Sequence, residues 1–260
     1  MQLVDDRVAC AAVTQDPAQL KRPVIGVIVD ETRALRAVRR GDQIDRVVLR
    51  ASLLNMPRAS GARSFAESAR ERLPDAKLWL YGWHYLSYIK TDGLASRASR
   101  KIDGKEYGHL RETPEVARAW EATMTAAKAA NAQGIVLKTP PSFSTSAVNR
   151  RRLRSFVEAH RQDGLSLCWE ADGLWSDESA IAFARELEIE AMLGVPPDAV
   201  DGSRGETWLK LGGEIRASRA DQLAYALEEL ETWPQLMFDG PAAFSNARTF
   251  ARIWADSYLA

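Results

Sequence analysis

Charged side chains stand where short apolar runs of the chain end, and they are the residues best suited to chemistry. The four catalytic candidates are Lys138, Glu170, Lys210 and Asp239. A lysine next to a carboxylate suits acid–base catalysis, because burial and neighbouring charges shift the pKa of either group. Lys138 or Lys210 could also form a Schiff base with a carbonyl substrate, and no sequence feature singles out either one.

Glycines and arginines near these runs favour an anionic ligand. Gly212 and Gly213 follow one of the last two runs, and a glycine lets backbone N–H groups approach an anion closely. Four arginines occur within residues 149–154, and we take Arg150 and Arg151 as candidate ligand-binding residues. In the other interpretation, the glycines form turns and the arginines form a solvated helix face.

Five further residues near the ends of runs are candidates for ligand contact: Arg50, Trp83, His84, Asp172 and Trp175. The indoles of Trp83, Trp175 and also Trp208 could stack on a sugar or a base, although packing in the core is the usual role of a tryptophan.

Metal binding has little support in the sequence. Of the three histidines, only His84 follows an apolar run closely, which argues against a histidine-rich zinc site. Carboxylates at Asp30, Glu170, Asp172 and Asp239 are of the type that Mg²⁺ prefers, but their spacing is not diagnostic. We predict no metal and no cofactor.

The elements that must position these residues are apolar runs that alternate with helical patterns. Strands are expected at residues 24–29, 46–50, 77–81, 134–138, 165–170, 191–194, 207–211 and 235–238. Helices are expected at residues 31–40, 64–72, 113–130, 150–160, 177–187, 218–231 and 243–258, with a polar loop at 90–111.

Eight successive βα units predict an α/β fold, specifically a closed (βα)₈ TIM barrel. An open doubly wound sheet is the alternative, but it would usually show a glycine-rich turn after the first strand, where this chain has Asp30-Glu-Thr-Arg33. In a TIM barrel the site lies at the C-terminal ends of the strands. We therefore expect Lys138, Glu170, Lys210 and Asp239 to share one mouth.

Length and composition fit a single domain. The chain has 260 residues, close to the roughly 250 of a typical TIM barrel, and residues 1–22 form a possible N-terminal extension. Lys plus Arg and Asp plus Glu both number 35, so a generally basic nucleic-acid binder is not indicated. Two cysteines without CxxC spacing, no signal peptide and no membrane span predict a cytoplasmic protein. The oligomeric state is not determined.

Several short segments carry a family resemblance. They are Leu137-Lys-Thr-Pro-Pro-Ser-Phe143 with Asn149 and Arg152-Leu153, Trp175, Phe238-Asp-Gly240 with Asn246-Ala247, and Leu54-x-Met-Pro57. In order and spacing, from Val24 to the C-terminus, the chain resembles the YecE-like family of TIM barrels (domain of unknown function 72, DUF72).

Departures from the family pattern fall mostly on its polar positions. Val48 and Arg50 replace a Glu and an Asn, Tyr81 replaces a Lys, and Lys138 replaces a Gln. The fifth strand has Trp169-Glu-Ala-Asp172 in place of Glu-Phe-Arg-His, and the seventh lacks the family's His. The resemblance therefore implies a divergent member, and the family name implies no reaction.

Two functions fit these observations. The first is an enzyme that acts on a small anionic molecule, such as a sugar phosphate or nucleotide, by acid–base chemistry. The second is a non-catalytic barrel that binds nucleic acid or another anionic ligand through residues 90–111 and the arginine run. The first predicts a closed pocket of mixed charge, and the second predicts an open basic surface.

Overall fold

The computed structural model describes residues 22–104, 106–161, 164–196, 199–200, 205–228, 230 and 232–258. Its eight strands pair in chain order, all parallel, and β8 pairs with β1 to close a barrel. The strands are β1 Ile25–Val29, β2 Arg46–Leu49, β3 Lys77–Tyr81, β4 Gly134–Lys138, β5 Ser166–Glu170, β6 Glu190–Gly194, β7 Trp208–Leu211 and β8 Gln235–Phe238. The predicted TIM barrel is confirmed. Apart from Arg22, the possible N-terminal extension lies outside the described residues.

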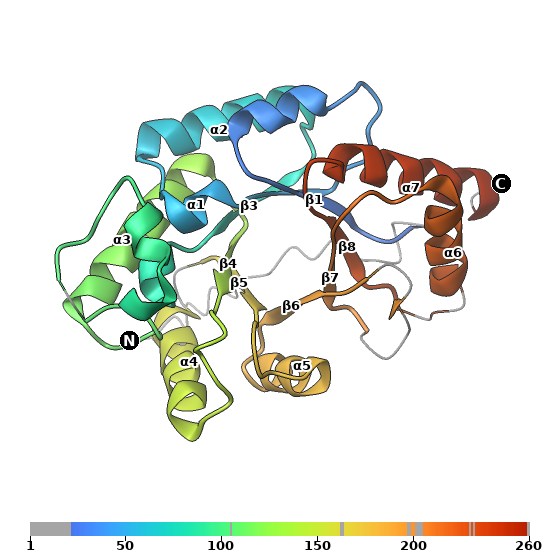
Figure 1. Ribbon diagram of the computed structural model, residues 1–260. Helices are drawn as coiled ribbons and strands as arrows, with labels where there is room; N and C mark the ends of the chain where they lie inside the picture. The colour runs from blue at the N-terminus through green and yellow to red at the C-terminus, as the bar shows by residue number, and fades with distance from the viewer. Residues whose placement is uncertain are drawn as a thin grey trace, which may run out of the picture.

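Helices surround the strands, as Figure 1 shows. The α-helices are α1 Ala51–Leu54, α2 Ala59–Arg72, α3 Pro114–Ala130, α4 Ala147–His160, α5 Asp177–Glu186, α6 Ala217–Glu228 and α7 Ala243–Tyr258. Short 3₁₀ helices are η2 Thr32–Ala37, η3 His84–Leu86, η4 Lys90–Asp92 and η5 Leu94–Arg97. The helix expected at 31–40 is thus only η2, and the polar loop expected at 90–111 contains η4 and η5.

Hydroxyl side chains fix where three of the helices begin. Thr113 accepts a hydrogen bond from the N–H of Val116 at the start of α3, and Ser176 does the same for Ser179 at the start of α5. Ser146 caps α4, which therefore begins three residues earlier than the predicted start at Arg150. Ser218, expected as the cap of α6, lies inside that helix.

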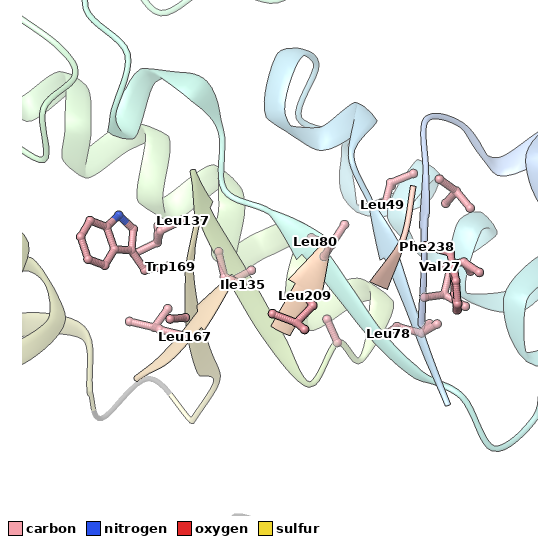
Figure 2. Close-up of a cluster of buried hydrophobic side chains, with 14 of the residues drawn as sticks. Val27, Leu49, Leu78, Leu80, Ile135, Leu137, Leu167, Trp169, Leu209 and Phe238 are labelled. Atoms are coloured by element: carbon pink, nitrogen blue, oxygen red, sulfur yellow. The ribbon is translucent and has the colours of Figure 1, made fainter. Parts of the chain in front are cut away.

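Successive side chains along each strand point alternately out of and into the barrel, and this separates two apolar cores. Outward side chains such as Leu80, Leu137 and Phe238 (Figure 2) pack with the buried faces of the helices. Inward side chains, including Trp79 and Trp208, form a second cluster inside the barrel. Because both faces of every strand are buried, the strands are almost continuously apolar.

The barrel interior is filled rather than hollow. The rings of Trp79 and Trp208 meet edge to face with centroids 4.7 Å apart. A Cβ on Gly134 would lie 2.3 Å from the Trp79 ring, so glycine there makes room for the indole. At the N-terminal end of the strands, Arg46 lies over the Trp208 ring and pairs with Glu190. The interior of the barrel is therefore filled by side chains at this end.

No helix in the described part of the chain is long and apolar enough to cross a membrane.

Candidate functional site at the barrel mouth

Six strands place a charged residue at their last inward position or just beyond it, at the C-terminal mouth of the barrel. These residues are Asp30, Arg50, Lys138, Glu170, Lys210 and Asp239. Since inward and outward side chains alternate and the strands are parallel, all six face the same end of the barrel. Tyr81 on β3 and Gly194 on β6 complete the ring.

Glu170 is the centre of the first charge cluster. It is 2% exposed, and its Oε1 accepts hydrogen bonds from Lys138 Nζ at 2.5 Å and from Lys210 Nζ. Its Oε2 accepts a hydrogen bond from the Tyr81 hydroxyl at 2.5 Å. Side chains from β3, β4, β5 and β7 thus meet at one carboxylate.

The electrostatics of this cluster keep Glu170 ionised. Burial raises the pKa of its carboxyl, but the charges of Lys210 and Lys138 and their hydrogen bonds outweigh burial and lower the pKa to about 2. Burial, followed by the charge of Glu170, raises the pKa of Tyr81 well above its usual value. Tyr81 is therefore a hydrogen-bond donor at neutral pH, and Glu170 is an acceptor that holds no proton.

A polar pocket of about 220 Å³ opens above Glu170. Lys138, Lys210 and Asp172 line it, and so does Gly194, which has no side chain to fill it. The Lys138 and Lys210 side chains are 20% and 21% exposed, whereas the Glu170 side chain is 3% exposed. A ligand in the pocket would therefore meet the two ammonium groups.

Asp239 lies at the same mouth but pairs elsewhere. Its carboxylate lies 2.6 Å from Arg50 Nη1, and the Arg50 guanidinium also binds Asp30 at 2.7 Å. The hydrogen bond with Asp30 and the charge of Asp239 raise the pKa of Arg50 despite its burial. Asp239 and Arg50 also affect the pKa of Tyr81, which lies between this second cluster and Glu170. The structure thus brings together Lys138, Glu170 and Lys210, with Asp239 beside them.

Two loops hold the rim of the pocket. Gly173 has φ 80°, and a Cβ there would lie 2.6 Å from Pro141 Cα, so the loops after β4 and β5 pack closely. The Trp175 indole N–H donates to the carbonyl of Phe143 at 2.9 Å. Asp172, on the second loop, lies 3.8 Å from Lys138 Nζ. Trp175 lines the pocket but is only 9% exposed and stacks on Phe183.

Three aromatic candidates are buried away from the mouth. His84 is 0% exposed, its Nδ1 lies 3.0 Å from the Leu53 carbonyl, and burial lowers its pKa to about 4. The Trp83 indole is buried and donates to the Leu54 carbonyl, and Trp208 lies inside the barrel. η3 follows β3 and turns the Trp83 and His84 rings into the core, whereas Trp208 lies at the start of β7 and points into the barrel, so none of the three rings lines the pocket.

The glycine and arginine candidates have different surroundings. A Cβ on Gly212 or Gly213 would meet no atom within 4 Å, so both glycines border open space, although neither lines the pocket. Arg150 lies over the Trp175 and Phe183 rings, and Arg151 is exposed. The guanidinium of Arg150 therefore packs on the aromatic rings at and before α5.

Tyr81 was not among the predicted site residues. Its signal was present in Lys77-Leu-Trp-Leu-Tyr81, since alternation puts Tyr81 on the same inward face as Trp79, at the end of the strand. No group of three or more His, Cys, Asp or Glu side chains arranged to hold a metal occurs among the described residues.

Comparison with solved structures identifies the fold. A DUF72 family protein from Enterococcus faecalis V583 superposes with a TM-score of 0.58 at 9% identity, over 90% of this chain and 98% of that chain. The chain has the fold of the DUF72 family. A second DUF72 family protein, from Thermotoga maritima MSB8, gives a TM-score of 0.49 at 14% identity over 81% of this chain and 84% of that chain.

The resemblance read from the proline-containing segment and Trp175 is confirmed at the level of the fold. 3-Keto-L-gulonate-6-phosphate decarboxylase from Vibrio cholerae gives a TM-score of 0.47 at 15% identity, over 91% of this chain and 99% of that chain. No family model and no curated protein matches the sequence.

Proposed function

We propose that this chain is a divergent DUF72 barrel that acts as an enzyme on a small anionic molecule, with acid–base chemistry in the pocket above Glu170. The observation that carries the proposal is the convergence of two lysine ammonium groups on one buried, ionised carboxylate. Asp172 lies 3.8 Å from Lys138 Nζ, so two carboxylates offset the two ammonium charges, and an anionic oxygen would be bound by hydrogen bonds from the ammonium groups themselves. A pocket of about 220 Å³ is smaller than the ~300–1,000 Å³ typical of drug-sized ligands, which favours a small metabolite.

In this proposal, Lys138 and Lys210 bind and polarise an oxygen of the substrate. Glu170 holds both ammonium groups in place, so they need no reorganisation when negative charge grows on that oxygen. Such an arrangement suits enolisation of a carbonyl compound, in which the proton of a C–H bond moves to a base while its electron pair delocalises onto the oxygen.

A base must then accept the proton. Glu170 is a weak base, because its pKa is about 2. We assign proton transfer to Asp172, whose half-exposed carboxylate lines the same pocket. Asp239 is bound to Arg50, which also pairs with Asp30, so we give Asp239 no part in the proton transfer.

The nucleic-acid alternative has weaker support. It requires an open basic surface made by residues 90–111 together with the arginines of residues 149–154. Arg150 instead packs over Trp175, and Arg154 pairs with Glu186 and lies over the Phe183 ring. The cytoplasmic location expected from the sequence stays a prediction.

A thermal-shift screen tests the proposal, using carboxylated and phosphorylated metabolites. A ligand at 100 times its Kd stabilises the folded state by ~2.7 kcal/mol, which corresponds to a rise in Tm of roughly 5–10 °C for a domain of this size. The shift should vanish in Lys210→Met and persist in Lys128→Met, the same change at an exposed position on α3.

A hit is then assayed for exchange of its C–H protons in deuterated water. If Asp172→Asn still binds the ligand but no longer exchanges its C–H protons, the assignment of Asp172 as the base is supported. If every shift persists in both Lys138→Met and Lys210→Met, the pocket is not the site and the proposal fails.

A further inference from the structure

Helix α4 directs its arginines to two different sides. On one side, Arg150 lies over Trp175, and Arg154 lies over Phe183, against α5. On the other side, Phe156 and His160 contact the Trp120 ring of α3. Arg152 precedes Phe156 by one helical turn, so its side chain points toward α3 and the segment before it. The arginine run is therefore divided, with Arg150 and Arg154 against α5 and Arg152 directed toward α3.

Arg111 belongs to the segment that precedes α3, and the phase of α4 directs Arg152 toward that segment. Burial, followed by the charges of Arg111 and Arg151, lowers the pKa of Arg152. No carboxylate of the described residues forms an ion pair with Arg111 or Arg152. The Nε atom of Arg111 is buried and has no hydrogen-bond partner in the described part of the chain. Like charges held together with an unsatisfied buried donor are costly, unless an anion joins them.

A hydrogen-bonded pair of polar side chains joins this segment to the loop before α4. His109 is 8% exposed, and its Nε2 lies 2.9 Å from the hydroxyl of Ser142, which is itself exposed. The charges of Arg111 and Arg152 act on the His109 ring and, after burial, help to lower its pKa. Asp92 is the acidic side chain that acts on His109 in the opposite direction, but its carboxylate is engaged by the N–H of Ile89.

The backbone that presents His109 and Arg111 is rigid and strained. Gly108, His109 and Leu110 all have positive φ, at 83°, 51° and 51°. A Cβ on Gly108 would lie 2.2 Å from the Tyr88 carbonyl oxygen, so this position requires glycine. The N–H groups of residues 108–110 donate to the carbonyls of Tyr85, Ser87 and Leu86 on and beside η3. Non-glycine residues in this region of φ occur often at ligand clamps.

We infer that Arg111, Arg152, His109 and Ser142 form a binding site for one phosphate group of a small phosphorylated molecule. Guanidinium groups bind phosphate in paired hydrogen bonds. A further phosphate oxygen can accept the one N–H or O–H that the mutual hydrogen bond of His109 and Ser142 leaves free. A single group fits better than a nucleic-acid backbone, since the neighbouring Arg150 and Arg154 are already engaged. None of the four residues lines the pocket above Glu170, so this site does not depend on the proposed function.

The test measures binding of inorganic phosphate to the full chain by titration calorimetry. Arg152→Ala should weaken binding about 10-fold or more, as expected for the loss of a charge-assisted hydrogen bond, and Arg152→Lys should give an intermediate loss because the paired geometry is missing. Arg63→Ala, an exposed arginine on α2, removes the same charge elsewhere and should leave binding unchanged.

A spectroscopic readout locates the anion. Saturating phosphate should raise the pKa of the His109 ring followed by NMR, assigned by its absence in His109→Gln, because the anion offsets the two arginine charges. Equal phosphate affinity in wild type and Arg152→Ala, or loss in Lys210→Met with retention in Arg152→Ala, would overturn the inference. A phosphorylated metabolite that binds more tightly than phosphate supports it. An oligonucleotide that binds more tightly than either would contradict a one-phosphate site if the dependence of its affinity on salt concentration corresponds to contacts with several phosphates.

Discussion

Replacing Glu170 with Gln tests the charge cluster below the pocket, because the change removes one negative charge and nearly conserves size. The pKa of the Glu170 carboxyl is about 2 in the folded protein, against an ordinary value of 4.5. At ~1.36 kcal/mol per pKa unit, that difference corresponds to a stabilisation of the folded state by roughly 3 kcal/mol at neutral pH. The residue is 2% exposed, so solvent screening reduces this little. Removal of one partner from a buried ion pair costs ~3–5 kcal/mol in other proteins.

The pH dependence gives the sharper test. Since the pKa of Glu170 is lower in the folded state, its contribution is present above the unfolded value of 4.5 and is lost as the pH falls toward 2. About 2 kcal/mol of it should be gone at pH 3. Urea unfolding of wild type and Glu170→Gln at pH 7 and pH 3 measures the difference in unfolding free energy, which should shrink by about that amount.

Glu158→Gln is the matched control, because Glu158 is exposed on α4. Its unfolding free energy should stay within about 0.5 kcal/mol of wild type at both pH values. If Glu170→Gln is as stable as wild type at pH 7, or if its deficit is the same at pH 3, the lysines do not hold Glu170 ionised and the reasoning is refuted.

Three further predictions concern Tyr81, Gly134 and metal. Tyr81→Phe leaves Glu170 Oε2 without its hydroxyl donor and should lower the unfolding free energy, measured in urea, by ~1–3 kcal/mol. Tyr225→Phe, at an exposed ring, should leave the unfolding free energy unchanged. Equal effects of the two changes would contradict the hydrogen bond. Gly134→Ala should cost ~1–3 kcal/mol by overpacking against the Trp79 ring, while Gly212→Ala, in open space, should be nearly neutral; a neutral Gly134→Ala would show that the ring yields. Treatment with EDTA should leave Tm unchanged, and a drop of several degrees would reveal a bound metal.

Strands and helices could be predicted closely because their signals are local. The runs at residues 77–81, 134–138 and 235–238 match β3, β4 and β8 at both ends. Thr113 and Pro114 mark the start of α3 through hydrogen bonding and a fixed φ, which involve only neighbouring residues. The start of α4 was placed three residues late, because Ala147-Val-Asn carries no strong helix signal and the cap Ser146 stands among other polar residues.

Partner choice at the mouth depended on the tertiary structure. Lys138, Glu170, Lys210 and Asp239 all stand at strand ends in the sequence, but the curvature of the barrel decides which side chains meet. The inward side chains of β4 and β7 converge on Glu170 of β5, whereas Asp239, just after β8, meets Arg50, just after β2. No rule of spacing along the chain distinguishes these pairings.

The sequence by itself determined the fold, the end of the barrel that carries the charges, and the identity of most residues there, because alternation and strand order need only local information. Burial and pKa were decided by the tertiary structure. η3 buries His84, α4 turns Arg150 toward α5 and Arg152 toward α3, and two lysines from separate strands keep Glu170 ionised. These outcomes depend on distances between residues far apart in the chain, and electrostatic energies change steeply with such distances in a buried site.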